Sequence, residues 1–133
     1  MKLLDTTFLI HYWAGKQPVR EYLEAHKEHE FCTTTLNLKE IAVGQALRGE
    51  LDRQEIAATF DWVTVRPFER EHAFAASELE ATLHETAGVN QDKINALAAD
   101  VLIAAVAKTE NATVVTKSVA DFEQFEGVAV ETY

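Results

Sequence analysis

The chain has 133 residues, of which 47% are hydrophobic, and its 22 acidic and 12 basic residues give a formal charge of −10. This length suits a single domain, 1–133, in which roughly 65–70% of the unfolded surface can be buried. The composition excludes a fibrous or disordered chain, and the acidic balance argues against a surface that attracts nucleic acid or anionic lipid over its whole area. The sequence contains no apolar run of membrane-spanning length and no signal-peptide layout, so we expect a cytoplasmic protein without membrane contact.

Short β-branched runs alternate with helical patterns along the whole chain. In the first half of the chain we expect a strand at 2–5, helices at 6–15 and 18–28, a strand at 30–34, helices at 37–49 and 52–62, and a strand at 63–68. In the second half we expect a helix at 69–87, a polar loop at 88–95 and a helix at 96–108. A strand at 113–117, a short helix at 118–125 and a closing strand at 128–132 complete the chain. This alternation indicates an α/β fold in which a parallel sheet is covered by helices on both faces.

Four acidic residues fall where such a sheet forms ligand sites. Asp5 ends the first strand, and Glu40 lies in the first turn of the helix after the second strand. Asp121 follows the strand at 113–117, and Asp100 lies near the start of the helix that leads into it. Because the carboxyl ends of parallel strands and the starts of the following helices share one edge of the sheet, we expect all four carboxylates at that edge.

A capping role is an alternative for most of these positions. Asp5 precedes an apolar helix and is suited to be its N-cap. Asn37 and Glu40 have the spacing of a capping box, and Ser118 and Asp121 have the same spacing. These alternatives remain open at the level of the sequence.

Asp100 is harder to explain as a structural residue. It is the one polar side chain between Ala96 and Ala107, and no lysine or arginine lies three or four residues away. An unpaired buried carboxylate is costly, so either the helix begins at Asp100 and the residue caps it, or a cation meets it.

A cluster of carboxylates at one edge needs such a cation. Two like charges about 4 Å apart repel by about 4 kcal/mol at an effective dielectric constant of 20. Oxygen ligands favour the hard ions Mg²⁺ or Mn²⁺, whereas the single Cys32 is expected in the core and the scattered histidines offer no zinc set. The sequence therefore predicts a Mg²⁺ or Mn²⁺ site.

Four segments together resemble a known family: LLDTTFLI near the start, Glu40 after a threonine-rich strand end, ADVLIAAVA around Asp100, and VVTKSVADFEQF near the end. This series resembles the PIN-domain ribonucleases, especially the VapC-type toxins of toxin–antitoxin pairs. The resemblance covers the whole chain. It implies a PIN-like three-layer α/β/α sandwich and a metal-dependent endoribonuclease that hydrolyses RNA, with transfer RNA among the candidate substrates.

The resemblance also implies roles for individual residues. Asp5 and Asp100 would be the main metal ligands, with Glu40 in the same cluster and Thr6 or Thr7 as a hydroxyl partner. Lys117 beside them would bind RNA. The fourth acidic position of the family falls on Ser118, which is a departure, and Asp121 three residues later would replace its charge. Asp5, Glu40, Asp100, Ser118 and Asp121 are thus the candidate catalytic residues.

The resemblance also implies partners. An antitoxin segment is expected over the acidic edge, and a homodimer is expected to form through helix faces, with the helix from Asn37 and the aromatic residues Phe8, Tyr12 and Trp13 as candidate contacts. One alternative is a receiver-like phosphoacceptor switch, since VVTK supplies a late Thr and Lys. The other is a non-catalytic PIN-like binding module.

Overall fold

The computed structural model describes residues 1–133 and is built on one five-stranded parallel sheet with the strand order β3-β2-β1-β4-β5. The strands are β1 (Lys2–Leu4), β2 (Phe31–Thr34), β3 (Thr64–Arg66), β4 (Thr113–Val115) and β5 (Val130–Glu131). The helices are α1 (Thr6–Trp13), α2 (Gln17–Ala25), α3 (Thr35–Leu47), α4 (Arg53–Thr59), α5 (Arg70–Glu85), α6 (Gln91–Ala96), α7 (Ala98–Thr109) and α8 (Val119–Phe122). The predicted α/β/α sandwich is confirmed.

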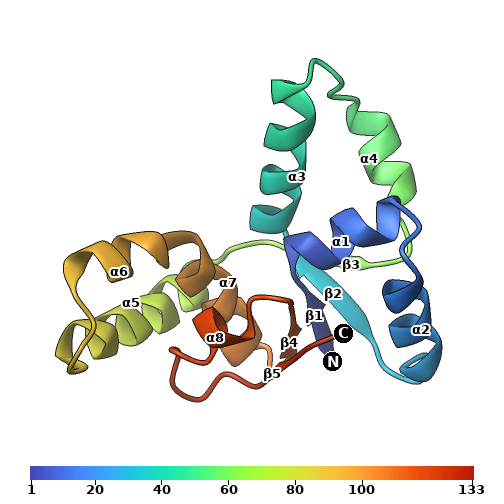
Figure 1. Cartoon of the computed structure of the whole chain (residues 1–133). Helices are drawn as coiled ribbons and strands as arrows, with labels where there is room; N and C mark the ends of the chain where they lie inside the picture. Colours follow the sequence, from blue (N-terminus) through green and yellow to red (C-terminus); the bar gives the residue numbers. More distant parts are fainter.

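Two hydrophobic cores flank the sheet, because neighbouring residues of each strand point to opposite faces. Leu3 and Val114 belong to the core under α5, α6, α7 and α8, whereas Leu4 and Val115 belong to the core under α1, α2 and α4. Figure 1 shows these two groups of helices on either side of the strands. The short central strands are therefore apolar on both faces, as expected for a parallel sheet.

The helices α3 and α4 form a hairpin that stands away from the sheet (Figure 1). The base of α3 is fixed by buried Ile41, while its far end carries Val43 and Leu47, which are 43% and 84% exposed. Of the aromatic residues predicted as partner contacts, Phe8 is completely buried in the core, so the prediction is wrong for Phe8. Tyr12 and Trp13 are half-buried and pack against the same core.

Residues 88–95 were predicted to form a loop, but most of this segment belongs to α6. The helix begins because the Asn90 side chain accepts a hydrogen bond from the Lys93 backbone at 2.9 Å and thus caps the helix. Ile94 anchors the helix by inserting into the core. Because the rest of α6 is polar, the sequence pattern did not reveal that Ile94 anchors a helix here.

None of the helices has the length and apolar character needed to cross a membrane.

Candidate active site

Asp5 is a buried carboxylate at the carboxyl end of β1, where it is only 7% exposed. Although it precedes α1, its side chain makes no capping hydrogen bond. Instead, Thr116 donates a hydrogen bond to Asp5 Oδ2 at 2.8 Å, and Asn37 donates one to Asp5 Oδ1 at 3.3 Å. Burial raises the pKa of Asp5 above its ordinary value, although these hydrogen bonds oppose the rise. Asp5 therefore occupies the N-cap position of α1, as the capping alternative expected, but its side chain does not cap the helix.

Asn37 connects Asp5 to the rest of the site and was missed as a site residue by sequence reasoning. It is completely buried, and its Nδ2 also donates to Thr6 Oγ1 at 2.9 Å. Its Oδ1 accepts hydrogen bonds from the backbone and hydroxyl of Thr34 at 3.2 and 2.6 Å. Every polar atom of the Asn37 side chain therefore has a partner, and the amide is held in one orientation.

The start of α3 differs from the prediction because Thr34, not Asn37, is its N-cap. Thr34 and Asn37 form the capping box, so the proposed box of Asn37 and Glu40 is wrong. Glu40 then lies in the second turn of α3 rather than the first. Its exposed carboxylate accepts a hydrogen bond from Thr6 Oγ1 at 2.9 Å, which orients it toward the same edge as Asp5.

Asp100 is half-buried in the first turn of α7, a helix that begins at Ala98 with Leu97 as its N-cap position. The alternative in which Asp100 caps the helix is therefore wrong. Burial and the negative charges of three other carboxylates raise its pKa to about 6, and Lys93 opposes the rise; the three are Asp5, Asp121 and Glu40. The four predicted acidic residues thus interact electrostatically across the carboxyl edge of the sheet.

Asp121 is paired with a cation from α6. Lys93 Nζ lies 3.2 Å from Asp121 Oδ1, and both side chains are exposed by about four tenths. Ser118 makes no side-chain capping bond to α8, so the proposed cap by Ser118 and Asp121 is not formed. The Ser118 backbone donates to Thr116 Oγ1 at 2.9 Å, which ties the Ser118 loop to the hydroxyl that holds Asp5.

The two remaining predicted residues lie at the margin of this network. Thr7 is half-buried in α1, and its hydroxyl takes part in no side-chain hydrogen bond. Lys117 is exposed and follows Thr116, with its Nζ 4.3 Å from the centre of the Tyr133 ring. The side chains of Asp5, Thr6, Glu40 and Asn37 form the hydrogen-bonded part of the site, and Asp100 faces it.

The donor chemistry fits a hard divalent ion, because the site offers carboxylate oxygens and one lysine opposes four negative charges. However, no group of three or more His, Cys, Asp or Glu side chains is arranged to hold a metal ion. Glu40 is exposed and Asp121 is held by Lys93, so closing a metal site requires these side chains to turn toward Asp5 and Asp100.

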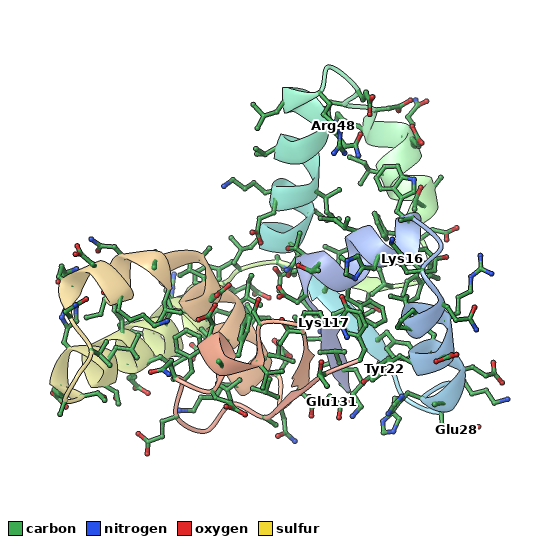
Figure 2. All side chains as sticks on the ribbon, viewed as in Figure 1. Lys16, Tyr22, Glu28, Arg48, Lys117 and Glu131 are labelled. Atoms are coloured by element: carbon green, nitrogen blue, oxygen red, sulfur yellow. The ribbon has the colours of Figure 1, made fainter.

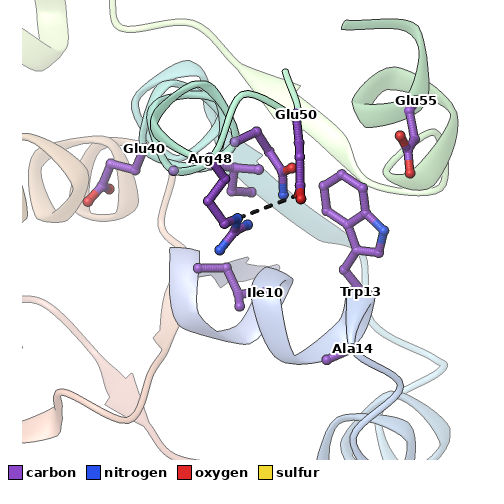
Figure 3. Close-up of a pocket in the computed structure, with 10 residues that line it drawn as sticks. Ile10, Trp13, Ala14, Glu40, Arg48, Glu50 and Glu55 are labelled. Atoms are coloured by element: carbon purple, nitrogen blue, oxygen red, sulfur yellow. Dashed lines mark ion pairs between the residues drawn. The ribbon is translucent and has the colours of Figure 1, made fainter. Parts of the chain in front are cut away.

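A pocket of about 530 Å³ adjoins this site between α1 and α3. Figure 3 shows Glu40 at one end of the pocket and Arg48, Glu50 and Glu55 farther along it. Arg48 Nε lies 3.7 Å from Glu50 Oε2, while Ile10 and Trp13 of α1 supply apolar lining. Glu40 therefore belongs both to the acidic site and to this pocket.

A parallel sheet with carboxylates gathered at its carboxyl edge defines an α/β domain with a candidate hydrolytic metal site. The family model described as the PIN domain matches residues 2–126 of the chain. The chain belongs to the PIN domain family. A search of curated protein sequences found no match.

Three solved structures have the same fold. VapBC2 from Rickettsia felis bound to a promoter DNA fragment matches with a TM-score of 0.79 and 19% identity over 99% of this chain and 98% of that chain. DNA-bound VapBC from Salmonella typhimurium matches with a TM-score of 0.74 and 21% identity over 99% and 98%. A toxin–antitoxin complex from Klebsiella pneumoniae matches with a TM-score of 0.69 and 19% identity over 97% and 96%.

Proposed function

We propose that this PIN-domain protein is a metal-dependent endoribonuclease that hydrolyses RNA phosphodiester bonds as the toxin of a toxin–antitoxin pair. The observation that carries the proposal is the position of half-buried Asp100 at the same edge of the sheet as three other carboxylates, where burial first and then their negative charges raise its pKa. Buried structural carboxylates are normally paired with cations. The four carboxylates at this edge together carry more negative charge than the single Lys93 can offset. The family membership supports residues 1–133 as one catalytic domain.

The metal ligands in this proposal are Asp5, Glu40, Asp100 and Asp121, and the ion is Mg²⁺ or Mn²⁺. Bound there, it would lower the pKa of a water and offset the charge that develops on the phosphate. The chain supplies the orientation. Asn37 and Thr116 fix both oxygens of Asp5, and Thr6 directs Glu40 toward the same edge.

The RNA contacts in this proposal lie on either side of Asp5. Thr6 and Thr7 begin α1, and Lys117 follows the end of β4. Ser118 supplies no negative charge at the fourth acidic position, so Asp121 supplies it in this proposal, with Lys93 paired to Oδ1, one of its two oxygens.

An antitoxin and a second copy of the chain are the proposed partners. The Klebsiella pneumoniae relative in fold is a toxin–antitoxin complex. The pocket beside Glu40 combines apolar lining with Arg48 and is open to a partner segment that covers the acidic edge. For the homodimer, the exposed apolar residues Val43 and Leu47 of α3 offer the contact surface.

The receiver-like alternative is disfavoured by the sheet. Receiver domains have the strand order 2-1-3-4-5, whereas this sheet has the order β3-β2-β1-β4-β5. The non-catalytic binding module has the same fold and differs only in whether the carboxylates act on RNA. Cleavage assays separate it from the nuclease.

The test is incubation of the full chain with single-stranded RNA and transfer RNA in Mn²⁺, Mg²⁺ or EDTA. We expect cleavage with either metal, none in EDTA, and loss of at least about a hundredfold in Asp100→Asn. Asp61→Asn is the matched control, because Asp61 is an exposed carboxylate before β3 and outside the acidic site. Equal metal-dependent cleavage by wild type and Asp100→Asn would contradict the assignment.

A further inference from the structure

Three neighbouring strands end at the same edge of the sheet, and the residues that follow them meet there. Asp5 follows β1, Lys117 lies just beyond β4, and Tyr133 lies just beyond β5. The strands β1 and β5 both pair with β4, so the chain after β4 lies between the other two. Figure 2 shows Lys117 in this central position, beside α1.

The Tyr133 ring is held by contacts with α1. Its centre lies 4.8 Å from that of completely buried Phe8, in an edge-to-face arrangement. Its hydroxyl lies 2.8 Å from His11 Nδ1, and the His11 ring makes a second edge contact at 5.9 Å. A ring fixed at its edge and at its hydroxyl offers a stationary face to a neighbouring side chain.

Lys117 occupies that face, with its Nζ 4.3 Å from the ring centre. This is the geometry of a cation–π contact, which restrains a side chain that otherwise moves freely. Lys117 takes part in none of the ion pairs of the structure, although four carboxylates lie at the same edge. Lys93, by contrast, is paired with Asp121.

The preceding residue links this contact to the acidic site. Thr116 donates its hydroxyl hydrogen to Asp5 Oδ2 at 2.8 Å, so Lys117 is attached to the backbone that orients Asp5. Burial and, to a smaller extent, the charge of Asp5 raise the pKa of Tyr133 to about 12, which agrees with a ring close to the site and a hydroxyl that stays protonated. A phosphate at the acidic edge would thus meet in Lys117 a lysine that takes part in no ion pair.

We propose that Tyr133 is a positioning residue for RNA binding: its ring holds Lys117 beside Asp5, where the ammonium group meets a phosphate next to the bond that is cleaved. This inference rests on the proposed ribonuclease function and names a residue outside the predicted site. Tyr133 itself touches neither the metal ligands nor the reacting atoms. Because the ring already restrains the Lys117 side chain, less conformational entropy is lost when RNA binds.

The experiment compares Tyr133→Phe, Tyr133→Leu, Lys117→Ala and the double variant Tyr133→Leu/Lys117→Ala in the cleavage assay over a range of salt concentrations. Tyr133→Phe keeps the ring and its contact with Phe8 but loses the hydroxyl contact with His11, so KM should rise less than in Tyr133→Leu. Tyr133→Leu keeps apolar contact with Phe8 but loses the cation–π contact, so we expect KM to rise about two- to fivefold with little change in kcat. In the Lys117→Ala background the same leucine substitution should have no further effect on KM.

Two further measurements separate positioning from a structural role. The salt dependence of log KM should become weaker by about 0.7 in Lys117→Ala, as expected for one lost phosphate contact with single-stranded RNA. Lys27→Ala removes an exposed charge paired with Glu24 and should leave the slope unchanged. The ring should shift the Lys117 ε-proton NMR signals upfield in wild type and Tyr133→Phe but not in Tyr133→Leu.

The possible outcomes are distinct. An unchanged KM in Tyr133→Leu, or an increase of equal size with and without Lys117, overturns the positioning role while leaving the ribonuclease intact. Absence of metal-dependent cleavage by the wild-type chain overturns both the proposed function and this inference.

Discussion

Asn37 donates a hydrogen bond to Asp5 across 32 positions of the chain, with 3.3 Å between Asn37 Nδ2 and Asp5 Oδ1. The same amide group donates to Thr6, and its oxygen accepts from Thr34. One buried side chain therefore joins the end of β1, the start of α1 and the start of α3. The positions of Asp5, at the end of β1, and of Glu40, in α3, therefore both depend on the Asn37 side chain.

Substitution of Asn37 by alanine should destabilise the protein by about 2–3 kcal/mol, because it leaves buried partners at Asp5, Thr6 and Thr34 unsatisfied. The free energy of unfolding from urea titration measures this loss. Asn95→Ala serves as the control, because Asn95 is exposed on α6 and bonds only Gln91 through its side chain. Equal stability of the two variants would show that the buried network contributes nothing.

Replacement of Asp100 by asparagine should stabilise the metal-free protein at neutral pH. Burial and neighbouring negative charges raise the pKa of Asp100 from 3.8 to about 6. The unfolded chain loses this proton at lower pH than the folded protein does. The free energy of unfolding of the wild type therefore falls as the pH rises from the unfolded pKa to the folded pKa. Because Asp100 is only half-buried, solvent reduces the expected gain to about 1 kcal/mol.

Urea titrations in EDTA at about pH 4 and about pH 7.5 measure this difference, which should be small at the lower pH and full at the higher. Adding Mn²⁺ at the higher pH should raise the melting temperature of wild type but not of Asp100→Asn, since the ion binds the folded state through the carboxylates. A metal response of the same size in both proteins would remove Asp100 from the ligand set.

Tyr22 and Glu131 connect α2 to β5, and this pair should make stability depend on pH. Burial alone would raise the pKa of Glu131, but hydrogen bonds from Tyr22 and Lys2 outweigh it and lower the pKa. A carboxylate with a lowered pKa stabilises the fold above its unfolded pKa and loses that contribution as the pH falls. Tyr22→Phe should therefore reduce the free energy of unfolding more at pH near 7 than at pH near 3.

The thermal unfolding of Tyr22→Phe and wild type over that pH range tests the pair. The difference in melting temperature should shrink as the pH falls, because protonated Glu131 no longer needs the hydroxyl. Tyr12→Phe is a suitable control, since the Tyr12 hydroxyl has no hydrogen-bond partner among the side chains and Tyr12 packs against Trp62 through its ring. A constant difference at all pH values would show that Glu131 is not responsible.

Cys32 should be unreactive toward a thiol reagent in the folded protein. It is completely buried in β2, and this burial raises the pKa of its thiol to about 11. Because the thiolate is the reacting form, Ellman's reagent should modify Cys32 only after denaturant unfolds the chain. Rapid modification in buffer alone would mean that β2 opens locally, and Cys32→Ser would identify the signal.

The strand and helix pattern was predictable because it depends on neighbours in the sequence. The leucine pair in Lys2–Leu4 and the β-branched run Thr113–Val115 form strands at the expected places, and the apolar segment Ala98–Thr109 forms the expected helix. The prediction failed where a single cap decides the structure. Thr34 starts α3 before Asn37, and Asn90 starts a helix in a segment that looked like a loop.

The sequence by itself determined that carboxylates follow the carboxyl ends of buried strands, because parallel strands and the helices after them share one edge. Only the tertiary structure decided how these groups are held. The register that pairs Leu4 with Val115 sets Thr116 beside Asp5, and the cap at Thr34 turns Asn37 toward the same carboxylate. Hydrogen bonds require atoms to be placed correctly to within a few tenths of an ångström. Those positions depend on the strand register and on the residue at which each helix starts, and the sequence pattern does not fix either.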